Sequence, residues 1–169
     1  MMDRLFVAAR AVLFGTLFVT FWGWVALSVR RLDFVARTAA PSGTRTYGVV
    51  ILAIGAALAL LSIATFVVRG RGTPAPFDPP RVFVATGPYR FVRNPMYIGG
   101  WLALVGLGLV EGSLAMIVFS FLWLSLAHLF VVLYEERALA GRFGNGYLDY
   151  CRRVGRWLPV NPTRRGHRS

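Results

Sequence analysis

Long uncharged apolar runs constrain this chain more than any other feature. Arg10 and Arg30 enclose nineteen uncharged residues. Arg45 and Arg69 enclose a second uncharged run, and a third covers residues 114–134. A transmembrane helix needs about 20 mainly apolar residues to cross roughly 30 Å of hydrocarbon. Each of the three runs is therefore long enough to span a membrane.

A fourth apolar run, residues 98–110, is too short for a complete span. As a helix its thirteen residues would extend about 20 Å. Only Glu111, Gly112 and Ser113 separate it from the third long run, which predicts a helical hairpin. We therefore expect an all-α integral membrane protein in a single domain, residues 1–169. It would have about four transmembrane helices near residues 5–29, 47–68, 96–110 and 114–136, a loop at 69–95 and a tail at 137–169.

The first apolar run is expected to be a retained helix. It is longer than the apolar core of a secretory signal peptide, and no small-x-small cleavage motif precedes Arg30.

Charge is scarce and strongly one-sided. Hydrophobic residues make up 56% of the chain and charged residues only 15%, against about 25% in a soluble domain. The net charge of +12 comes with little polar surface, so we expect no nucleic-acid partner. If the helices alternate in direction, fifteen of the nineteen arginines lie on one side. The positive-inside rule then predicts cytoplasmic termini in a bacterial inner membrane, with the basic face against anionic lipid.

The loop at 69–95 holds six of the nine prolines, which predicts an ordered, extended segment. It ends in Asn94 and Pro95, a sequence typical of an N-cap and the first helical position. This pair is explained either by helix initiation alone or by a binding site. In the second case the free N–H groups and the positive dipole end would bind a carboxylate or phosphate.

Polar residues near the end of the last apolar run are also candidates. Glu135 and Glu136 are two of only seven acids, and either interface pairing or ligand binding explains them. His128 lies seven residues before Glu135, roughly on the same helix face. It is either a functional group or is hydrogen-bonded to Ser125 or to the backbone.

The tail is expected to contain an amphipathic interfacial helix that could cover a site, with five residues on its apolar face: Phe143, Tyr147, Tyr150, Val154 and Trp157. Cys151 is single, so no disulfide is expected. Two histidines and one cysteine make a zinc site improbable, and we predict no metal site.

Three motifs follow one another along the chain. They are Thr86-Gly87-Pro88-Tyr89-Arg90, Arg93-Asn94-Pro95, Tyr97 and Gly99; Glu135-Glu136; and Phe143-Gly144, Tyr147, Tyr150, Val154, Arg156 and Pro159. In order and spacing these motifs resemble the superfamily of isoprenylcysteine carboxyl methyltransferases and phospholipid methyltransferases, and the resemblance covers about residues 47–160. The resemblance implies an S-adenosylmethionine-dependent methyltransferase whose cofactor pocket lies at the cytoplasmic face.

The resemblance also implies roles for individual residues. The implied cofactor-binding residues are Gly55, Val84, Tyr89, Asn94, Pro95, Met96, Tyr97 and Glu135. We expect Arg93 and the helix N-terminus to bind the cofactor carboxylate, Glu135 to bind its ribose or amino group, and Glu136 to accept a proton from an amine acceptor. Methyl transfer is an in-line displacement that depends on positioning, so no nucleophile constellation is required.

Two positions depart from the isoprenylcysteine branch. Its histidine is Asn94 here, as in phospholipid methyltransferases, and its substrate-binding arginine is Val131. The second change weakens the case for a prenylcysteine carboxylate. The expected acceptor is hydrophobic or lipid-like and enters laterally from the bilayer. Two alternatives are a membrane reductase using a nicotinamide cofactor and a non-catalytic membrane subunit; the oligomeric state is left open.

Overall fold

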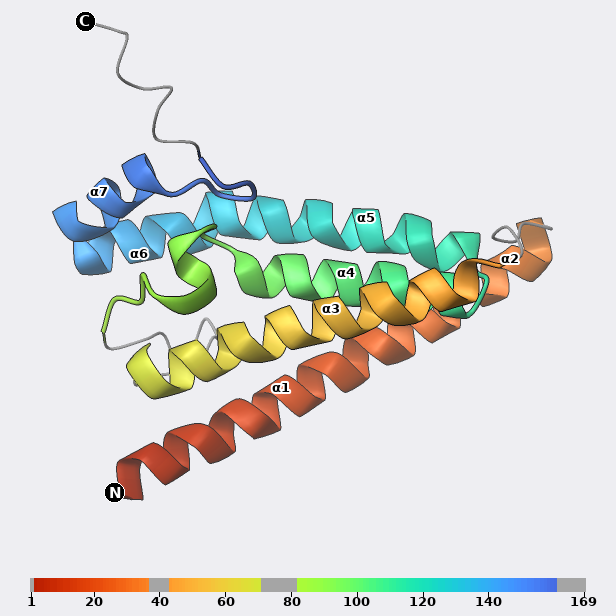
Figure 1. Cartoon of the computed structure of the whole chain (residues 1–169), viewed down its shortest axis with the longest axis horizontal. Helices are drawn as coiled ribbons and strands as arrows, with labels where there is room; N and C mark the ends of the chain where they lie inside the picture. Colours follow the sequence, from red (N-terminus) through yellow and green to blue (C-terminus); the bar gives the residue numbers. More distant parts are fainter. Residues whose placement is uncertain (1, 37–42, 71–81, 161–169) are drawn as a thin grey trace, which may run out of the picture.

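The computed structural model describes residues 2–36, 43–70 and 82–160. In these ranges the chain is helical (Figure 1). The elements, in order, are α1 (Met2–Val29), α2 (Arg31–Ala36), α3 (Thr44–Thr65), the π-helical turn η1 (Phe66–Gly70), the 3₁₀ turn η2 (Gly87–Arg90), α4 (Pro95–Val110), α5 (Leu114–Phe130), the π-helical turn η3 (Val131–Glu135), α6 (Glu136–Phe143) and α7 (Asn145–Arg153).

Three helical stretches are long and apolar enough to cross a membrane. They are Val12–Phe34, Thr44–Gly70 and Leu114–Phe143, each running through more than one of the elements above. The helix α4 is apolar but has only 16 residues. The expected all-α class is confirmed, with three helices of spanning length and a short one between them.

The short helix α4 packs most closely against α3, which the sequence analysis did not predict. A Cβ built on Gly106 would lie 2.4 Å from the backbone nitrogen of Leu52, and one on Gly55 would lie 2.5 Å from that of Ala103. Real Cβ atoms do not approach backbone so closely, so only glycine fits at these points. Glycine lets the two helix backbones approach each other, as in many membrane helix pairs.

Aromatic side chains fill the space between α1, α4 and α5. Trp123 of α5 is 5% exposed and makes ring contacts with Trp22 of α1 and Tyr97 of α4. Ala26 is almost fully buried in the same cluster. This packing attaches α1, which carries no recognised motif, to the rest of the bundle.

Polar contacts tie the helices together at the end with the α4–α5 turn. Ser113 is the N-cap of α5, and its side chain accepts a hydrogen bond from the Met116 backbone N–H. Asp33 accepts hydrogen bonds from the Ala115 N–H (2.9 Å) and from the Ser113 hydroxyl. A carboxylate at a helix N-terminus satisfies free N–H groups and complements the helix dipole. This contact anchors α2 to α5.

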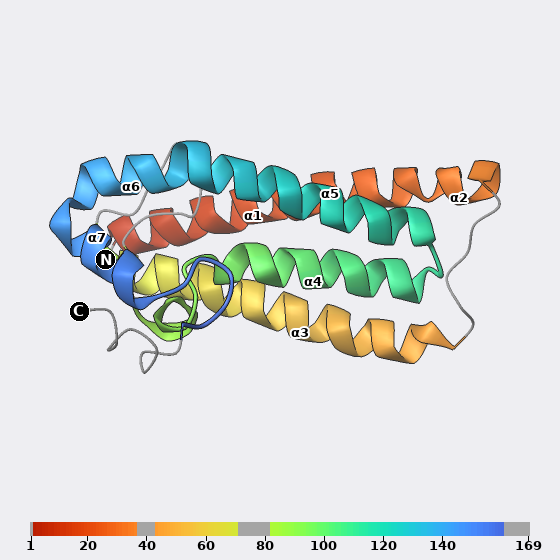
Figure 2. The ribbon, with the colours of Figure 1, turned by 90° about the horizontal axis from the view of Figure 1, so that it is seen from above.

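The opposite end of the bundle collects the segments that carry the sequence motifs. The two views agree that η2, the start of α4, α6 and α7 lie at this end, as does the start of α1 (Figures 1 and 2). The predicted tail helix is present as α7, with Tyr147 and Tyr150 buried. Val154 and Trp157 lie beyond its end, because the chain becomes extended at Val154 and turns back toward α4.

Candidate functional site

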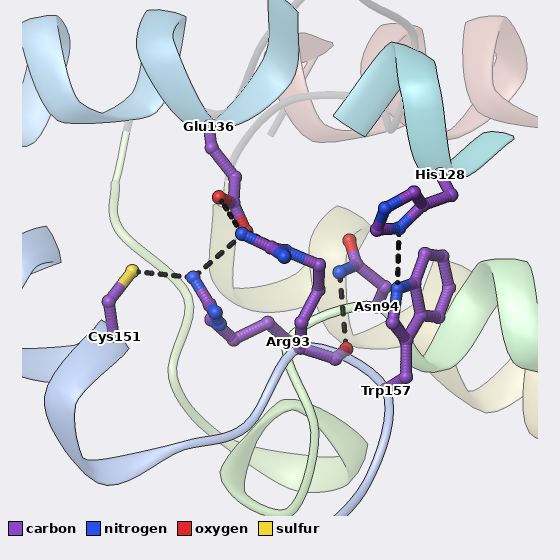
Figure 3. Close-up of polar contacts among 7 residues, drawn as sticks. Arg93, Asn94, His128, Glu136, Cys151 and Trp157 are labelled. Carbon is purple, nitrogen blue, oxygen red and sulfur yellow. Dashed lines mark hydrogen bonds and ion pairs between the residues drawn. The ribbon is translucent and has the colours of Figure 1, made fainter. Parts of the chain in front are cut away.

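Four segments meet at the N-terminus of α4. They are the stretch through η2, the start of α4, the long α5–η3–α6 helix around its η3 turn, and the chain after α7 (Figure 3). The returning chain is fixed by its backbone, because the Arg93 N–H donates to the Gly155 carbonyl at 2.8 Å. We call residues 154–157 the tail strap.

Glu135 is held by Tyr97. The Tyr97 hydroxyl donates to Glu135 Oε2 at 2.9 Å, joining the first turn of α4 to η3. A tyrosine hydroxyl is a natural donor to a carboxylate, and a carboxylate can accept several further hydrogen bonds. Glu135 therefore keeps acceptor capacity for a ligand hydroxyl or amino group.

Glu136 is held by two arginines. Arg156 of the tail strap makes a bidentate pair with it, both bonds being 2.8 Å, and Arg93 Nη1 lies 2.8 Å from its Oε1. The hydrogen bonds to Glu136 raise the pKa of Arg156 above its usual value. Bidentate arginine–carboxylate pairs are strong and geometrically specific. Arg93 Nη1 also donates to Cys151 Sγ at 2.9 Å.

Asn94 occupies the N-cap position of α4 but makes no side-chain cap hydrogen bond. Its Nδ2 instead donates to the Arg156 carbonyl at 3.2 Å. The predicted N-cap position is thus correct, while the side chain holds the tail strap. The first turn of α4 has no side-chain cap. Pro95 has no N–H and the Ile98 N–H donates to the Asn94 carbonyl, so the Met96 and Tyr97 N–H groups and the positive dipole end are left for another acceptor.

His128 has a different partner from the two considered in the sequence analysis. Its Nδ1 accepts a hydrogen bond from Trp157 Nε1 at 2.9 Å, whereas the Ser125 hydroxyl donates to the Phe121 carbonyl. The indole of Trp157 also contacts the ring of Tyr97, with centroids 6.5 Å apart. His128 therefore joins the tail strap to α5.

The π-helical turn η3 explains which glutamate faces which partner. In a regular α-helix, residues seven apart share a face, so His128 and Glu135 would point the same way. The i→i+5 bonding of a π turn inserts an extra residue and rotates the helix beyond the turn. Glu136 thus meets the tail strap that His128 also contacts, while Glu135 turns to Tyr97.

The segment before α4 packs on α7. Val84 and Tyr89 are both buried, and the Tyr150 hydroxyl donates to the Tyr89 carbonyl at 2.6 Å. Burial raises the pKa of Tyr150, so the phenol stays protonated and keeps this bond across ordinary pH. Gly87 has φ +61°, and a side chain there would approach the Thr65 hydroxyl. A glycine is therefore required at this turn.

The structure brings most of the predicted site residues together, with one exception. Contacts at the start of α4 link Arg93, Asn94, Tyr97, Glu135 and Glu136; Pro95 and Met96 form the same first turn, and Val84 and Tyr89 lie in the segment leading to it. Gly55 is separate, because it lies against Gly99 and Ala103 in the α3–α4 contact.

Arg156, Trp157 and Cys151 were not among the predicted site residues. Arg156 belongs to the matching motif, but its partner lies twenty residues away, and no local pattern indicates such a pairing. Within the described residues, Thr86 Oγ1, Arg93 Nε and Trp101 Nε1 are buried without a hydrogen-bond partner. The first two lie in the segment leading to α4. In the part of the chain that the structure describes, there is also no group of three or more His, Cys, Asp or Glu side chains that could hold a metal ion.

Comparison with known proteins gives one family and two named relatives. Residues 44–146 match the sequence model of a family described as phospholipid methyltransferase. The chain is 34% identical over 83 residues to the cobalt-zinc-cadmium resistance protein CzcN of Cupriavidus metallidurans, covering 49% of this chain and 38% of that protein. It is 32% identical over 76 residues to the nickel-cobalt-cadmium resistance protein NccN of Alcaligenes xylosoxydans xylosoxydans, covering 45% and 35%. The matched segment thus spans less than two fifths of either relative.

Proposed function

The chain belongs to the phospholipid methyltransferase family, and from this premise we propose that it transfers a methyl group from S-adenosylmethionine to a hydrophobic or lipid-like acceptor. Family membership and three helices of spanning length identify an integral membrane protein of a methyltransferase family. The observation that carries the finer proposal is the meeting of Glu135 and Tyr97 with the uncapped first turn of α4.

The donors and acceptors at this end suit the cofactor. Its carboxylate requires N–H donors, which the first turn of α4 and the unpartnered Arg93 Nε provide within the described residues. Its ribose hydroxyls and amino group require acceptors, which Glu135 provides. Thr86 is a further buried hydroxyl in the segment that leads to the site and has no partner among the described residues.

The bound cofactor would supply an electrophilic methyl group on sulfur. The protein's own residues would position it: Tyr97 orients Glu135, and the Arg93–Glu136–Arg156 pairs hold the tail strap over the start of α4. Both oxygens of Glu136 accept from arginine, which favours the charged form of this carboxylate. We therefore propose that Glu136 acts mainly in this ion-pair cluster; proton acceptance by it stays a prediction.

The proposed orientation places the site and both termini at the cytoplasmic face of a bacterial inner membrane. The arginine distribution supports it, because fifteen of nineteen lie in segments assigned to this side. The acceptor would then reach the methyl group laterally from the bilayer. The proposed partners of the protein are bilayer lipids and this acceptor, and no nucleic acid is among them.

Glu135→Gln tests the proposal directly. The change keeps the side chain's size but removes its charge and one acceptor, and hydrogen bonds to charged groups contribute about 1.5–3 kcal/mol. We expect the affinity for S-adenosylmethionine, measured by calorimetry on purified protein, to fall at least about tenfold. Glu111→Gln is the matched control, because Glu111 pairs with Arg30 at the other end of the bundle. No binding by the unmodified protein would refute the proposal.

A labelled methyl group identifies the class of the acceptor. Membranes that contain the protein are incubated with S-adenosylmethionine labelled in the methyl group, and lipid, protein and volatile fractions are counted separately. We expect label in the lipid or another hydrophobic small-molecule fraction. Label found only in protein would contradict a lipid-like acceptor. If no fraction is labelled but the membranes oxidise an added nicotinamide cofactor, the reductase alternative is favoured.

A further inference from the structure

We propose that His128 and Trp157 form a positioning pair that orients Tyr97 and Glu135 for cofactor binding. This inference rests on the proposed function and extends it to two residues outside the predicted cofactor site. It is carried by the hydrogen bond between their rings and by the contact of Trp157 with Tyr97.

The hydrogen bond and the ring contact restrict the orientation of both rings. An indole Nε1–H is only a donor, so His128 Nδ1 is the acceptor of this bond at 2.9 Å. The two rings also pack together, with centroids 5.9 Å apart, which restricts the rotation of the indole.

The indole transmits this restraint to the proposed cofactor site. It meets the Tyr97 ring at 70°, an edge-on arrangement typical of favourable aromatic pairs. The Tyr97 hydroxyl in turn holds Glu135. Trp123 contacts Tyr97 from the α5 side, so the Tyr97 ring touches an indole from α5 and another from the tail strap. Loss of Trp157 would remove one of these two ring contacts, so Tyr97, and through it Glu135, would be less restrained.

Packing alone does not require these two residue types. A phenylalanine would fill much of the space of an indole without a polar N–H that needs an acceptor. A histidine inside a spanning helix is costly in a membrane, and such residues usually have a functional role. His128 lies within the stretch Leu114–Phe143 and is one of only two histidines in the sequence.

The pairing itself is tested without any ligand. The protein is labelled with 5-fluorotryptophan, and the resonance of position 157 is assigned by its absence in Trp157→Phe. We expect His128→Leu to shift this resonance, because the acceptor is lost. His128→Asn should largely restore it, since the amide oxygen can take the place of Nδ1. A resonance that does not respond to His128→Leu would overturn the pairing.

The positioning role is tested by cofactor affinity. We expect His128→Leu and Trp157→Phe each to raise the Kd for S-adenosylmethionine about five- to thirtyfold, because part of the binding free energy would then be used to order Tyr97 and Glu135. The double variant should be no worse than the weaker-binding single one, because both changes remove the same interaction. His128→Asn should bind within about threefold of the unmodified protein.

Controls separate the possible failures. Trp24→Phe removes an exposed indole from α1 and should leave the Kd unchanged. Circular dichroism melting confirms that each variant is folded. Unchanged affinity in folded His128→Leu, or additive effects in the double variant, would overturn the positioning role while the proposed function stands. If the unmodified protein does not bind the cofactor, the proposed function fails and this role fails with it.

Discussion

At the scale of single residues, two adjacent glutamates have different surroundings. Glu135 meets one neutral hydroxyl, and Glu136 meets two guanidinium groups. The rarity of acids in this chain leaves interface pairing and ligand binding as alternatives for both, and the family resemblance predicts a site role. The sequence does not indicate which glutamate contacts which partner, because that depends on the π-helical turn and on the tail strap. No local sequence pattern marks the π-helical turn, and the tail strap contacts residues that are distant in the sequence.

Arg156 provides a prediction at this scale. Arg156→Gln removes the bidentate pair and leaves one cation beside a half-buried carboxylate, so we expect stability to fall by about 2 kcal/mol. It should also weaken cofactor binding, because the tail strap loses one of its anchors. Arg156→Lys should recover only part of the effect, since lysine cannot form the two parallel bonds.

The matched control is Arg152→Gln. Arg152 forms an exposed ion pair with Asp149 on α7, and such pairs contribute about 0–1 kcal/mol. Thermal unfolding in detergent and cofactor titration measure both variants. Equal effects of the two changes would mean that the pair with Glu136 does not hold the tail strap.

At the scale of elements, the spans are predictable and their packing partners are not. Hydropathy is a property of consecutive residues, so the apolar runs predict the helices, and the observed α4, Pro95–Val110, begins one residue from the expected start. The α3–α4 contact is different, because it joins Gly48 and Gly55 of α3 to Gly99 and Gly106 of α4, two glycine pairs that lie far apart in the sequence. A stripe of glycines permits close packing without naming the partner helix.

Gly106→Ala tests this contact. The added Cβ would meet the Leu52 backbone at 2.4 Å and the Gly48 carbonyl oxygen at 2.8 Å, and backbone cannot move aside as a flexible side chain can. Overpacking of this kind costs about 1–3 kcal/mol, so we expect the Tm to fall by several degrees. Gly23→Ala is the control, since a Cβ on Gly23 of α1 has nothing within 4 Å and should change stability by less than about 1 kcal/mol. Similar Tm values for both variants would contradict the close contact.

At the scale of the whole molecule, the two ends of the bundle differ in kind. The end with the α4–α5 turn is held by fixed contacts, among them Asp33 on the start of α5 and the pair of Arg30 with Glu111. The other end holds the uncapped turn of α4 and the tail strap, where polar groups without partners are found among the described residues. These features support the ligand site that we propose at the second end, which is also the end rich in arginine.

The same asymmetry predicts the orientation of the protein in the membrane. In a Cys151→Ser background, one cysteine is introduced at Asn145, at the start of α7, or at Arg45, at the start of α3; both positions are exposed. Because most arginines lie at the α7 end, the positive-inside rule places this end in the cytoplasm. A membrane-impermeant maleimide added to intact cells should therefore label Arg45→Cys and not Asn145→Cys, while both should react after lysis.

The loss of Arg45 removes a cation from the opposite side and so only strengthens the expected bias. Labelling of Asn145→Cys in intact cells would reverse the orientation and place the proposed cofactor site outside the cytoplasm, where S-adenosylmethionine is not made.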